Sequence, residues 1–313
     1  MIEFQNVSKA SDGAKVIDAL SLTIAKGEFA VLIGASGSGK STTLKMINRL
    51  IEHDSGRILI AGEQIRSFKP EELRRRMGYA IQSTGLFPHW TVEKNIATVP
   101  ALLKWQPARV RERVTELLEL LGLEPAHYRT RYPQQLSGGQ QQRVGVARAL
   151  AADPEVLLMD EPFGALDPIT RASLQAELAR IHRLSGKTIV LVTHDIDEAL
   201  RLATRIVMLD HGRIVQAGTP AELLAHPANE LVAEFIGRGD VGIKLLGLRT
   251  VADAMSAGRG GEAVEGEPID AGSSLREALS VFVARRVEVL PVIDAQQRVL
   301  GALHFADLLK APL

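Results

Sequence analysis

Apolar positions along the first two thirds of the chain follow two alternating patterns. Residues 29–33, 156–159 and 189–192 are short continuous apolar runs, which are typical of strands buried at the centre of a parallel sheet. Between the runs, apolar residues recur with helical spacing, and the clearest stripe occupies positions 110, 114, 117, 118 and 121. Strand and helix in alternation predict an α/β fold of the doubly wound type.

Two segments depart from this alternation. Residues 56–65 predict a hairpin that turns on Ala61 and Gly62. From about residue 88 to residue 150 the chain turns helical. We expect this stretch, 88–150, to be a helical insert in the α/β domain.

The pattern changes after residue 237. Residues 256–274 are rich in glycine and glutamate and have no apolar period. Two short strands are predicted at 287–293 and 298–304, and before them a helical stripe is formed by Leu275, Ala278, Leu279, Phe282 and Val283. We therefore predict two domains, residues 1–237 and a small α/β unit at 238–313.

Composition narrows the classes of partner. The 37 basic and 37 acidic residues cancel, so the chain lacks the basic excess of a nucleic-acid-binding protein, and we expect no nucleic-acid partner. The apolar runs are far shorter than the roughly 20 residues that cross a bilayer, and the first residues do not resemble a signal peptide. We expect any membrane role to come through a partner protein. The absence of cysteine excludes disulfides and thiol chemistry and fits a reducing interior.

A glycine-rich segment lies between a buried strand and a helix, the context that a phosphate-binding loop requires. Its glycines let backbone N–H groups close around phosphates, Lys40 adds a positive charge, and the Ser41 hydroxyl is a ligand for Mg²⁺. The alternative is an ordinary glycine-rich turn. The predicted ligands are a nucleotide and Mg²⁺, and the predicted contacts are Gly34, Ala35, Ser36, Gly37, Ser38, Gly39, Lys40, Ser41 and Thr42.

Two acids end the apolar run at 156–159. Asp160 is expected at the carboxyl end of a strand, where open α/β sheets bind ligands, and it is a candidate Mg²⁺ ligand through water. Glu161 is a candidate base for the water that attacks the γ-phosphate. Two solvated acids at a strand end are the alternative, which the phosphate-binding loop disfavours.

Two further polar residues follow apolar strands. His194 ends the strand that we expect beside that of Asp160, so it is a candidate catalytic contact to the γ-phosphate. Gln82 also follows a short apolar strand and is a candidate ligand of the metal or contact of the attacking water. Either residue alone is a weak signal, because a single polar residue at a strand end is usually structural.

A second anion-binding helix start occurs about a hundred residues after the first. Residues 136–140 read Leu-Ser-Gly-Gly-Gln and open a helix-forming run. The two glycines leave the backbone N–H groups of the helix start accessible to a ligand. The predicted nucleotide contacts are Ser137, Gly138, Gly139 and Gln140.

These motifs resemble, in the same order, those of the ATP-binding subunit of an ABC transporter. The motifs are residues 34–42, Gln82, 136–140, 157–162, 164–167 and His194. The resemblance covers residues 1 to about 237. It implies a P-loop ABC-type ATPase domain with a parallel core sheet, an antiparallel β-subdomain and a helical insert.

The resemblance also implies an assembly. Two subunits form a head-to-tail homodimer around two ATP molecules, and each ATP lies between the P-loop of one subunit and residues 136–140 of the other. Asp167 is a further nucleotide contact on this basis. The two helix starts would thus serve two different nucleotides.

Three longer stretches, 85–100, 136–171 and 192–200, are similar to the ATPases of importers for glycine betaine, choline and related osmoprotectants. This similarity implies integral-membrane permease subunits and a solute-binding protein as partners. It also implies a position on the cytoplasmic face of the inner (plasma) membrane, peripheral through the permease. Residues 274–309 resemble one CBS motif, which such ATPases often carry, so a second copy would have to come from the other subunit.

The chain departs from these families in two places. ABC ATPases usually stack adenine on an aromatic residue where this chain has Ser11, and Phe4 is the nearest aromatic side chain. Base stacking contributes about 1–3 kcal/mol, so we expect weaker or less selective base binding. Nucleotide-binding CBS motifs tend to have Thr or Ser three residues before an Asp, but here His304 precedes Asp307. We therefore favour a structural or dimer-contact role for the tail.

Two other functional classes remain open. One is a soluble ABC ATPase without a membrane partner, although such proteins usually fuse two cassettes or carry a long coiled coil. The other is a regulatory module in which ATP acts as a switch and the CBS-like tail gives the output. Glu161 and His194 favour hydrolysis over a simple switch. Co-purification with a permease would separate the importer from both alternatives.

Overall fold

The computed structural model describes residues 1–11, 13–81, 85–164, 166–257 and 266–310. The chain divides into two compact units, Met1–Ala217 and Gly218–Leu313, and each has its own hydrophobic core. The second unit therefore includes two short helices, 220–225 and 230–236, that precede the predicted domain boundary. The boundary after Gly237 remains a prediction. Within the described parts of the chain, no helix combines the length and the apolar character needed to span a membrane.

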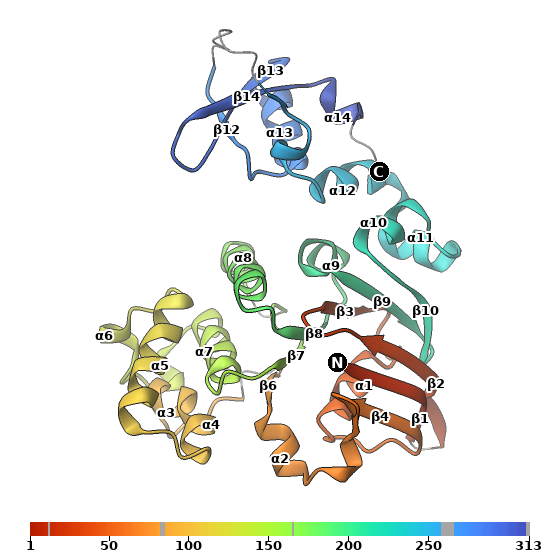
Figure 1. The fold of residues 1–313 in the computed structure, drawn as a ribbon, viewed down its shortest axis with the longest axis vertical. Helices are drawn as coiled ribbons and strands as arrows, with labels where there is room; N and C mark the ends of the chain where they lie inside the picture. Colours follow the sequence, from red (N-terminus) through yellow and green to blue (C-terminus); the bar gives the residue numbers. More distant parts are fainter. Residues whose placement is uncertain (12, 82–84, 165, 258–265, 311–313) are drawn as a thin grey trace. The chain divides into compact units, whose positions relative to one another are not determined.

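The first unit is built on a six-stranded sheet (Figure 1). Its strand order is β10-β9-β3-β8-β7-β6, and β9-β3-β8-β7-β6 are parallel. Every residue of β3, β7 and β8 is buried, as the continuous apolar runs predict. The strands are β3 (Phe29–Ile33), β6 (Met77–Ala80), β7 (Val156–Asp160), β8 (Thr188–Val192), β9 (Arg205–Asp210) and β10 (Arg213–Gly218).

A second sheet of the same unit is antiparallel, with the order β2-β1-β4-β5. Its strands are β1 (Ile2–Ser11), β2 (Ala14–Ile24), β4 (Ser55–Ile60) and β5 (Glu63–Gln64). The predicted hairpin is present: Ile60 pairs with Glu63. Ala61 and Gly62 between them have φ angles of 52° and 83°, the left-handed conformation that a two-residue hairpin turn requires.

Helices cover the parallel sheet and form the insert. Helices that contact the sheet directly include α1 against β7 and β8, α2 and α7 against β6, and α9 against β3. The insert helices α3 to α6 gather beside α7 (Figure 1). The helices are α1 (Lys40–Ile47), η1 (Ile65–Ser67), α2 (Pro70–Arg75), α3 (Val92–Ile96), α4 (Thr98–Leu102), α5 (Pro107–Leu120), α6 (Pro125–Tyr128), η2 (Pro133–Gln135), α7 (Gly138–Leu150), α8 (Pro168–Ser185) and α9 (Ile196–Leu202).

The second unit has a small sheet with the order β11-β14-β13-β12. Its core is closed by α13, which begins with a capping box between Ser274 and Glu277. Phe282 on α13 is only 2% exposed, whereas Val283 is 65% exposed, so including Val283 in the buried stripe was wrong. Of the predicted positions, Leu275, Ala278 and Phe282 are buried, and Leu279 is partly buried against the same core. The elements are α10 (Pro220–Ala225), α11 (Glu230–Ile236), η3 (Arg238–Asp240), α12 (Val241–Gly247), η4 (Val251–Asp253), β11 (Ser256–Ala257), β12 (Ile269–Asp270), α13 (Leu275–Arg285), β13 (Val289–Ile293), β14 (Val299–His304) and α14 (Asp307–Lys310).

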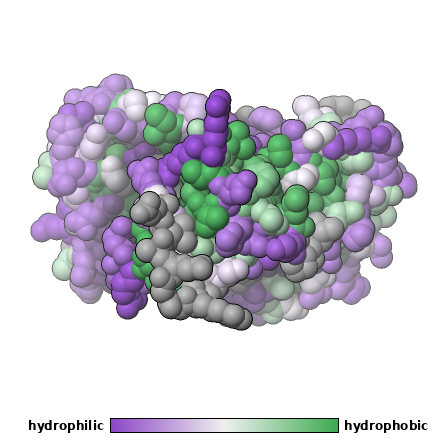
Figure 2. All heavy atoms as spheres, turned by 90° about the horizontal axis from the view of Figure 1, so that it is seen from above, coloured by the Kyte–Doolittle hydropathy of each residue, from purple (hydrophilic) through white to green (hydrophobic). Residues whose placement is uncertain are grey.

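Apolar side chains also reach the surface of the second unit. Val299 is 71% exposed and Leu309 is 85% exposed. Figure 2 shows hydrophobic residues among hydrophilic ones on the face seen from above, rather than an unbroken hydrophilic coat. An apolar groove of about 700 Å³ lies within this unit, and Ile243, Leu246, Leu279, Phe305 and Leu309 are among its lining residues.

Candidate nucleotide-binding site

The glycine-rich loop leaves the carboxyl end of β3 and enters α1, as the sequence predicts. Gly39 begins the helix with a φ angle of 98°. A Cβ atom there would lie 2.5 Å from Ile17 Cδ1, so glycine is required. The Lys40 ammonium donates hydrogen bonds to the carbonyl oxygens of Gly34 at 2.8 Å and Ala35 at 2.7 Å. Burial lowers the pKa of Lys40, and the loop's own carbonyls hold its charge at the centre of the cradle.

This loop borders a pocket of about 300 Å³ at the carboxyl ends of the parallel strands. A Cβ atom on Gly37 would meet nothing within 4 Å, so the backbone there faces open space. The pocket joins the loop to residues from β2, from the end of β7 and from the end of β8. Its lining residues are Val16, Ser36, Gly37, Gly39, Lys40, Ser41, Thr42, Glu161 and His194.

Two oxygen-bearing side chains lie together beside this pocket. Ser41 Oγ donates a hydrogen bond of 2.8 Å to Asp160 Oδ1, although 119 residues separate them in the chain. Asp160 is buried, with 4% exposure, and its other oxygen lies 3.4 Å from Lys45 Nζ. A hydroxyl and a carboxylate are the hard oxygen donors that Mg²⁺ prefers, so these residues fit that ion.

Glu161 and His194 meet at the pocket. Glu161 Oε2 lies 3.4 Å from His194 Nδ1. The Glu161 backbone N–H donates to Val192 O at 3.0 Å, which ties the end of β7 to the end of β8. The φ angle of Glu161 is 46°, a left-handed conformation that is uncommon outside glycine and that recurs at functional sites. The predicted proximity of the two strands is confirmed.

The second helix start is built as predicted but lies outside this pocket. Ser137 is the N-cap of α7, and its hydroxyl accepts a hydrogen bond from the N–H of Gln140. Ser137 and Gly138 are exposed, with open space at the Cβ position of Gly138. Among the described residues that line the pocket, none comes from 136–140. The two helix starts that the sequence predicts to bind anions are therefore separate in this chain.

Two predicted contacts remain apart from the pocket or outside the described chain. Asp167 is exposed and caps α8, and its carboxylate accepts a hydrogen bond from the N–H of Thr170 at 3.0 Å. Hydrogen bonding with Thr170 lowers the pKa of Asp167. Gln82 lies outside the residues that the structure describes. The roles of both side chains stay predictions.

An aliphatic residue of β2 lines the pocket. Val16 on β2 lines the pocket, whereas Phe4 is 2% exposed and belongs to the hydrophobic core. Phe4 therefore cannot stack on a base. Sequence reasoning missed Val16, although the alternating pattern that buries Ile17 and turns its neighbour outward could have indicated it.

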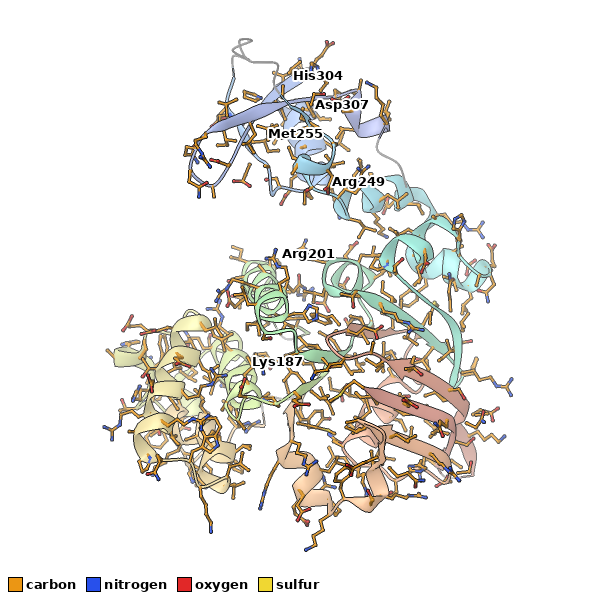
Figure 3. The ribbon with its side chains drawn as sticks, viewed as in Figure 1. Lys187, Arg201, Arg249, Met255, His304 and Asp307 are labelled. Carbon is orange, nitrogen blue, oxygen red and sulfur yellow. The ribbon has the colours of Figure 1, made fainter. Side chains whose placement is uncertain are left out.

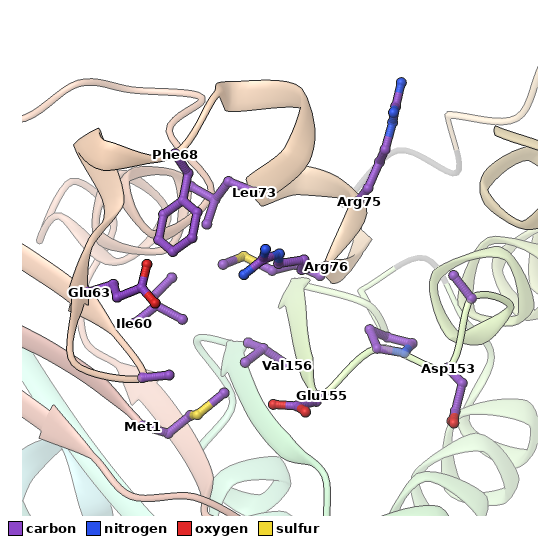
Figure 4. Close-up of a pocket in the computed structure, with 14 residues that line it drawn as sticks. Met1, Ile60, Glu63, Phe68, Leu73, Arg75, Arg76, Asp153, Glu155 and Val156 are labelled. Carbon is purple, nitrogen blue, oxygen red and sulfur yellow. The ribbon is translucent and has the colours of Figure 1, made fainter. Parts of the chain in front are cut away.

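A separate hollow of about 400 Å³ lies at the opposite ends of the strands (Figure 4). Met77 and Val156, which begin β6 and β7, line it together with Phe68 and Arg76. The Arg76 guanidinium lies 5.0 Å from the centre of the Phe68 ring. Ligands of open α/β sheets bind at the carboxyl ends of the strands, so this hollow is not the candidate nucleotide site.

The predicted tail residues have local partners (Figure 3). Asp307 accepts a hydrogen bond from the backbone N–H of His304 at 3.1 Å and pairs with Lys310 at 3.2 Å. Both contacts lie within three residues and organise the start of α14. In this geometry the Asp307 carboxylate has a structural role, because both of its contacts stabilise the start of α14.

Known proteins share this arrangement. The family model for the ABC transporter matches residues 17–164, and the model for the CBS domain matches residues 267–313. The glycine betaine uptake system ATP-binding protein YehX of Escherichia coli (strain K12) is 63% identical over 99% of both chains. The chain belongs to the ABC transporter family.

Other relatives agree with this assignment. The glycine betaine/carnitine/choline transport ATP-binding protein OpuCA of Bacillus subtilis (strain 168) is 51% identical, and the alignment covers 96% of this chain and 77% of the relative. A dimeric structure of the ABC transporter cassette MJ0796 is 35% identical with a TM-score of 0.64. It covers 70% of this chain and 99% of that cassette. The ABC-type ATPase fold and the CBS-like tail are thus confirmed.

Proposed function

We propose that this chain is the ATP-hydrolysing, energy-coupling subunit of an importer for glycine betaine, choline and related osmoprotectants. The observation that carries the ATPase role is the convergence of Lys40, Asp160, Glu161 and His194 at the ends of adjacent strands. The choice of solute rests on the relative that matches 99% of this chain at 63% identity and is named for glycine betaine uptake.

Each residue has a distinct task in hydrolysis. The loop N–H groups and Lys40 bind the phosphates and neutralise their charge. Ser41 and Asp160 are the residues that would hold Mg²⁺, with Gln82 as a further candidate, and the ion would supply charge neutralisation on the phosphate oxygens. Glu161 accepts a proton from the attacking water, and His194 holds the Glu161 carboxylate through the 3.4 Å contact.

Hydrolysis requires two subunits in this account. Ser137 and the α7 N-terminus are exposed and lie outside the pocket of their own chain, so they are available to the nucleotide of a second copy. The dimeric structures of MJ0796, one of which holds ADP and Pi, support a dimer of this kind. We infer a homodimer around two MgATP, in which each site takes its P-loop from one subunit and its 136–140 segment from the other.

The helical insert offers a surface for the permease. A mostly apolar groove of about 450 Å³ runs along α3 and α4, lined by Trp90, Lys94, Ala97, Thr98, Ala101 and Leu102. His89 is exposed and Trp90 is partly exposed. Trp90 lies 4.6 Å from Phe87, centre to centre, so the two rings support each other. We infer that this groove receives a short helix of an integral-membrane permease.

The remaining partners follow from this role. A permease would hold the chain at the cytoplasmic face of the inner (plasma) membrane. A solute-binding protein would deliver the osmoprotectant to the permease and act on this chain only indirectly. Solute contacts would lie in those two proteins, because the pocket beside the P-loop of this chain is suited to phosphates.

The test replaces Trp90 by glutamate in the complex with its permease, reconstituted in vesicles. A charge in the apolar groove should block docking, so we expect ATP-driven uptake of radiolabelled glycine betaine to fall at least about tenfold while basal ATP hydrolysis persists. Trp105→Glu is the matched control, because Trp105 lies outside the groove with Arg109 packed 3.7 Å over its ring. Unchanged uptake by Trp90→Glu would contradict the docking site, and vesicles that hydrolyse ATP without importing any quaternary amine would contradict the importer.

A further inference from the structure

A cluster of buried polar side chains lies directly behind the His194 turn. The Thr193 hydroxyl donates a hydrogen bond of 2.6 Å to Glu198 Oε2 and accepts one of 3.1 Å from the N–H of Asp195. Thr193 is 2% exposed and Glu198 is 6% exposed. The residues on either side of His194 are therefore held in place through Thr193, whose hydroxyl is bound by the side chain of Glu198 on α9.

Glu198 is costly to bury. Burial raises the pKa of its carboxyl, and the Thr193 hydrogen bond and the Arg171 charge oppose that effect. A buried carboxylate is destabilising unless its partners compensate for the lost water. A glutamine or an apolar residue would fill the same space with a smaller desolvation penalty. The presence of an acidic side chain at this position therefore needs an explanation.

Arg171 connects this cluster to the loop that follows Glu161. Its guanidinium lies 3.9 Å from Glu198 Oε1 and 3.7 Å from Asp195 Oδ2. The same guanidinium donates a hydrogen bond of 3.3 Å to the carbonyl oxygen of Leu166. One side chain on α8 therefore holds both the segment that leads away from Glu161 and the helix that follows His194.

These contacts close a ring around the reacting groups. The ring of contacts leads from Leu166 to Arg171, from Arg171 to Glu198 and from Glu198 to Thr193. It is closed by the contact of His194, the neighbour of Thr193, with Glu161. Small displacements of catalytic groups reduce rates strongly, because the reacting geometry must be held in advance. A ring of this kind limits how far His194 can move from Glu161.

We propose that Arg171, Glu198 and Thr193 are positioning residues that hold His194 against Glu161 during ATP hydrolysis. The proposal rests on the ATPase activity of this site. None of the three lines the nucleotide pocket, so loosening the ring should slow turnover without weakening nucleotide binding. A merely structural cluster would instead change thermal stability and leave the turnover of folded protein intact.

The experiment measures steady-state ATP hydrolysis by the full chain over a range of MgATP concentrations. Thr193→Val keeps the branched shape but removes the hydroxyl, and Arg171→Met removes the guanidinium. We expect kcat to fall about tenfold in each variant while KM for MgATP changes less than about twofold. Thr193→Ser restores the hydroxyl and should recover kcat to within about twofold of the wild type.

Arg201→Met is the matched control. Arg201 on α9, labelled in Figure 3, also reaches α8, and its 3.3 Å hydrogen bond goes to Gln175 rather than to Leu166 or Glu198. We expect its kcat to equal that of the wild type. The proposal is overturned if Arg171→Met and Thr193→Val keep wild-type kcat, if KM rises in place of a fall in kcat, or if Thr193→Ser is as slow as Thr193→Val.

The same measurements separate this inference from the function on which it rests. If the wild type and Arg201→Met hydrolyse ATP and Arg171→Met matches them, only the positioning role fails. If the wild type hydrolyses no ATP as the full chain or with its permease, the ATPase assignment fails. Melting temperatures of all variants, taken at the assay pH, identify any loss of kcat that comes from unfolding. If Arg171→Met is unfolded, the turnover of Arg171→Lys tests the positioning role instead. Lysine keeps the charge but cannot contact Leu166 and Glu198 together, so wild-type turnover by folded Arg171→Lys would also overturn the proposal.

Discussion

Polar side chains are used differently in the two units of the chain. In the first unit they join residues that are far apart in sequence, such as Ser41 with Asp160 and Arg171 with Glu198. In the second unit the side-chain pairs between described residues are mostly local, as in Thr250 with Asp253. Local pairs end helices and turns, whereas long-range pairs assemble reacting groups from several elements. The contrast places the chemistry in the first unit.

Burial follows the same division. Lys40 and Asp160 are buried at the nucleotide site with 6% and 4% exposure. Among the described residues, no charged side chain of the second unit is buried to that extent. Its groove is apolar, and several of its large apolar residues are exposed. Such a surface is suited to packing against another apolar surface rather than to catalysis.

The largest expected effect comes from removing the proposed base. Glu161→Gln should bind MgATP but hydrolyse it about 10²–10⁴-fold more slowly, because the amide cannot accept the proton of the attacking water. Lys40→Ala should instead lose nucleotide binding, since it removes the cradle's charge. Single-turnover hydrolysis and fluorescent-nucleotide titration measure the two effects. Normal hydrolysis by Glu161→Gln would show that the chemistry lies elsewhere.

A smaller effect tests whether the two cores are independent. Phe29 is fully buried in the first unit and Phe282 is 2% exposed in the second. Truncating either ring to alanine should destabilise its own unit by about 3–5 kcal/mol. We expect Phe282→Ala to leave the rate of ATP hydrolysis within about twofold of the wild type, since none of the described residues that line the site belongs to the tail. Calorimetry measures the stability of each unit, and ATPase assays measure the rate. Loss of hydrolysis in folded Phe282→Ala would show that the core of the second unit is needed for the chemistry of the first.

The smallest effect concerns pairing of the tails. We expect two tails to associate through their exposed apolar residues, because a single CBS-like copy leaves part of its apolar surface uncovered. Phe282 cannot make this contact, since it is buried in the core of its own unit. Leu309→Glu should weaken nucleotide-free self-association about tenfold, equivalent to about 1.4 kcal/mol. Leu184→Glu is the matched control on the first unit, where Leu184 is 75% exposed. Equal association constants for the two variants in sedimentation would exclude tail pairing.

Sequence patterns predicted the features that depend on neighbours along the chain. Continuous apolar runs identified β3, β7 and β8, and the glycine spacing identified the P-loop. Both patterns have a local cause, because a buried strand must be apolar throughout and a phosphate cradle needs glycine at fixed positions. The hairpin at Ala61 and Gly62 is another local case.

Features that depend on distant contacts were missed or misread. The ring through Arg171, Glu198 and Thr193 joins separate elements, and nothing in the local pattern of these residues distinguishes them from surface polar residues. Val283 was placed in the apolar stripe because helical spacing does not show how much of the helix surface is covered by neighbouring elements. Val16 was overlooked because a pocket wall is defined by its distance to the loop and not by its own residue type.

The central claim is that each nucleotide is shared between the P-loop of one subunit and the 136–140 segment of another. The most direct measurement is the mass of the full-length Glu161→Gln protein in solution, by sedimentation with and without MgATP. We predict that MgATP strongly increases dimerisation of this variant, that the nucleotide-bound dimer holds two nucleotides, and that the MgATP-dependent increase is lost in the double variant with Ser137→Arg. A protein that binds MgATP at the P-loop yet stays monomeric at all nucleotide concentrations, without or with the permease, would contradict the account.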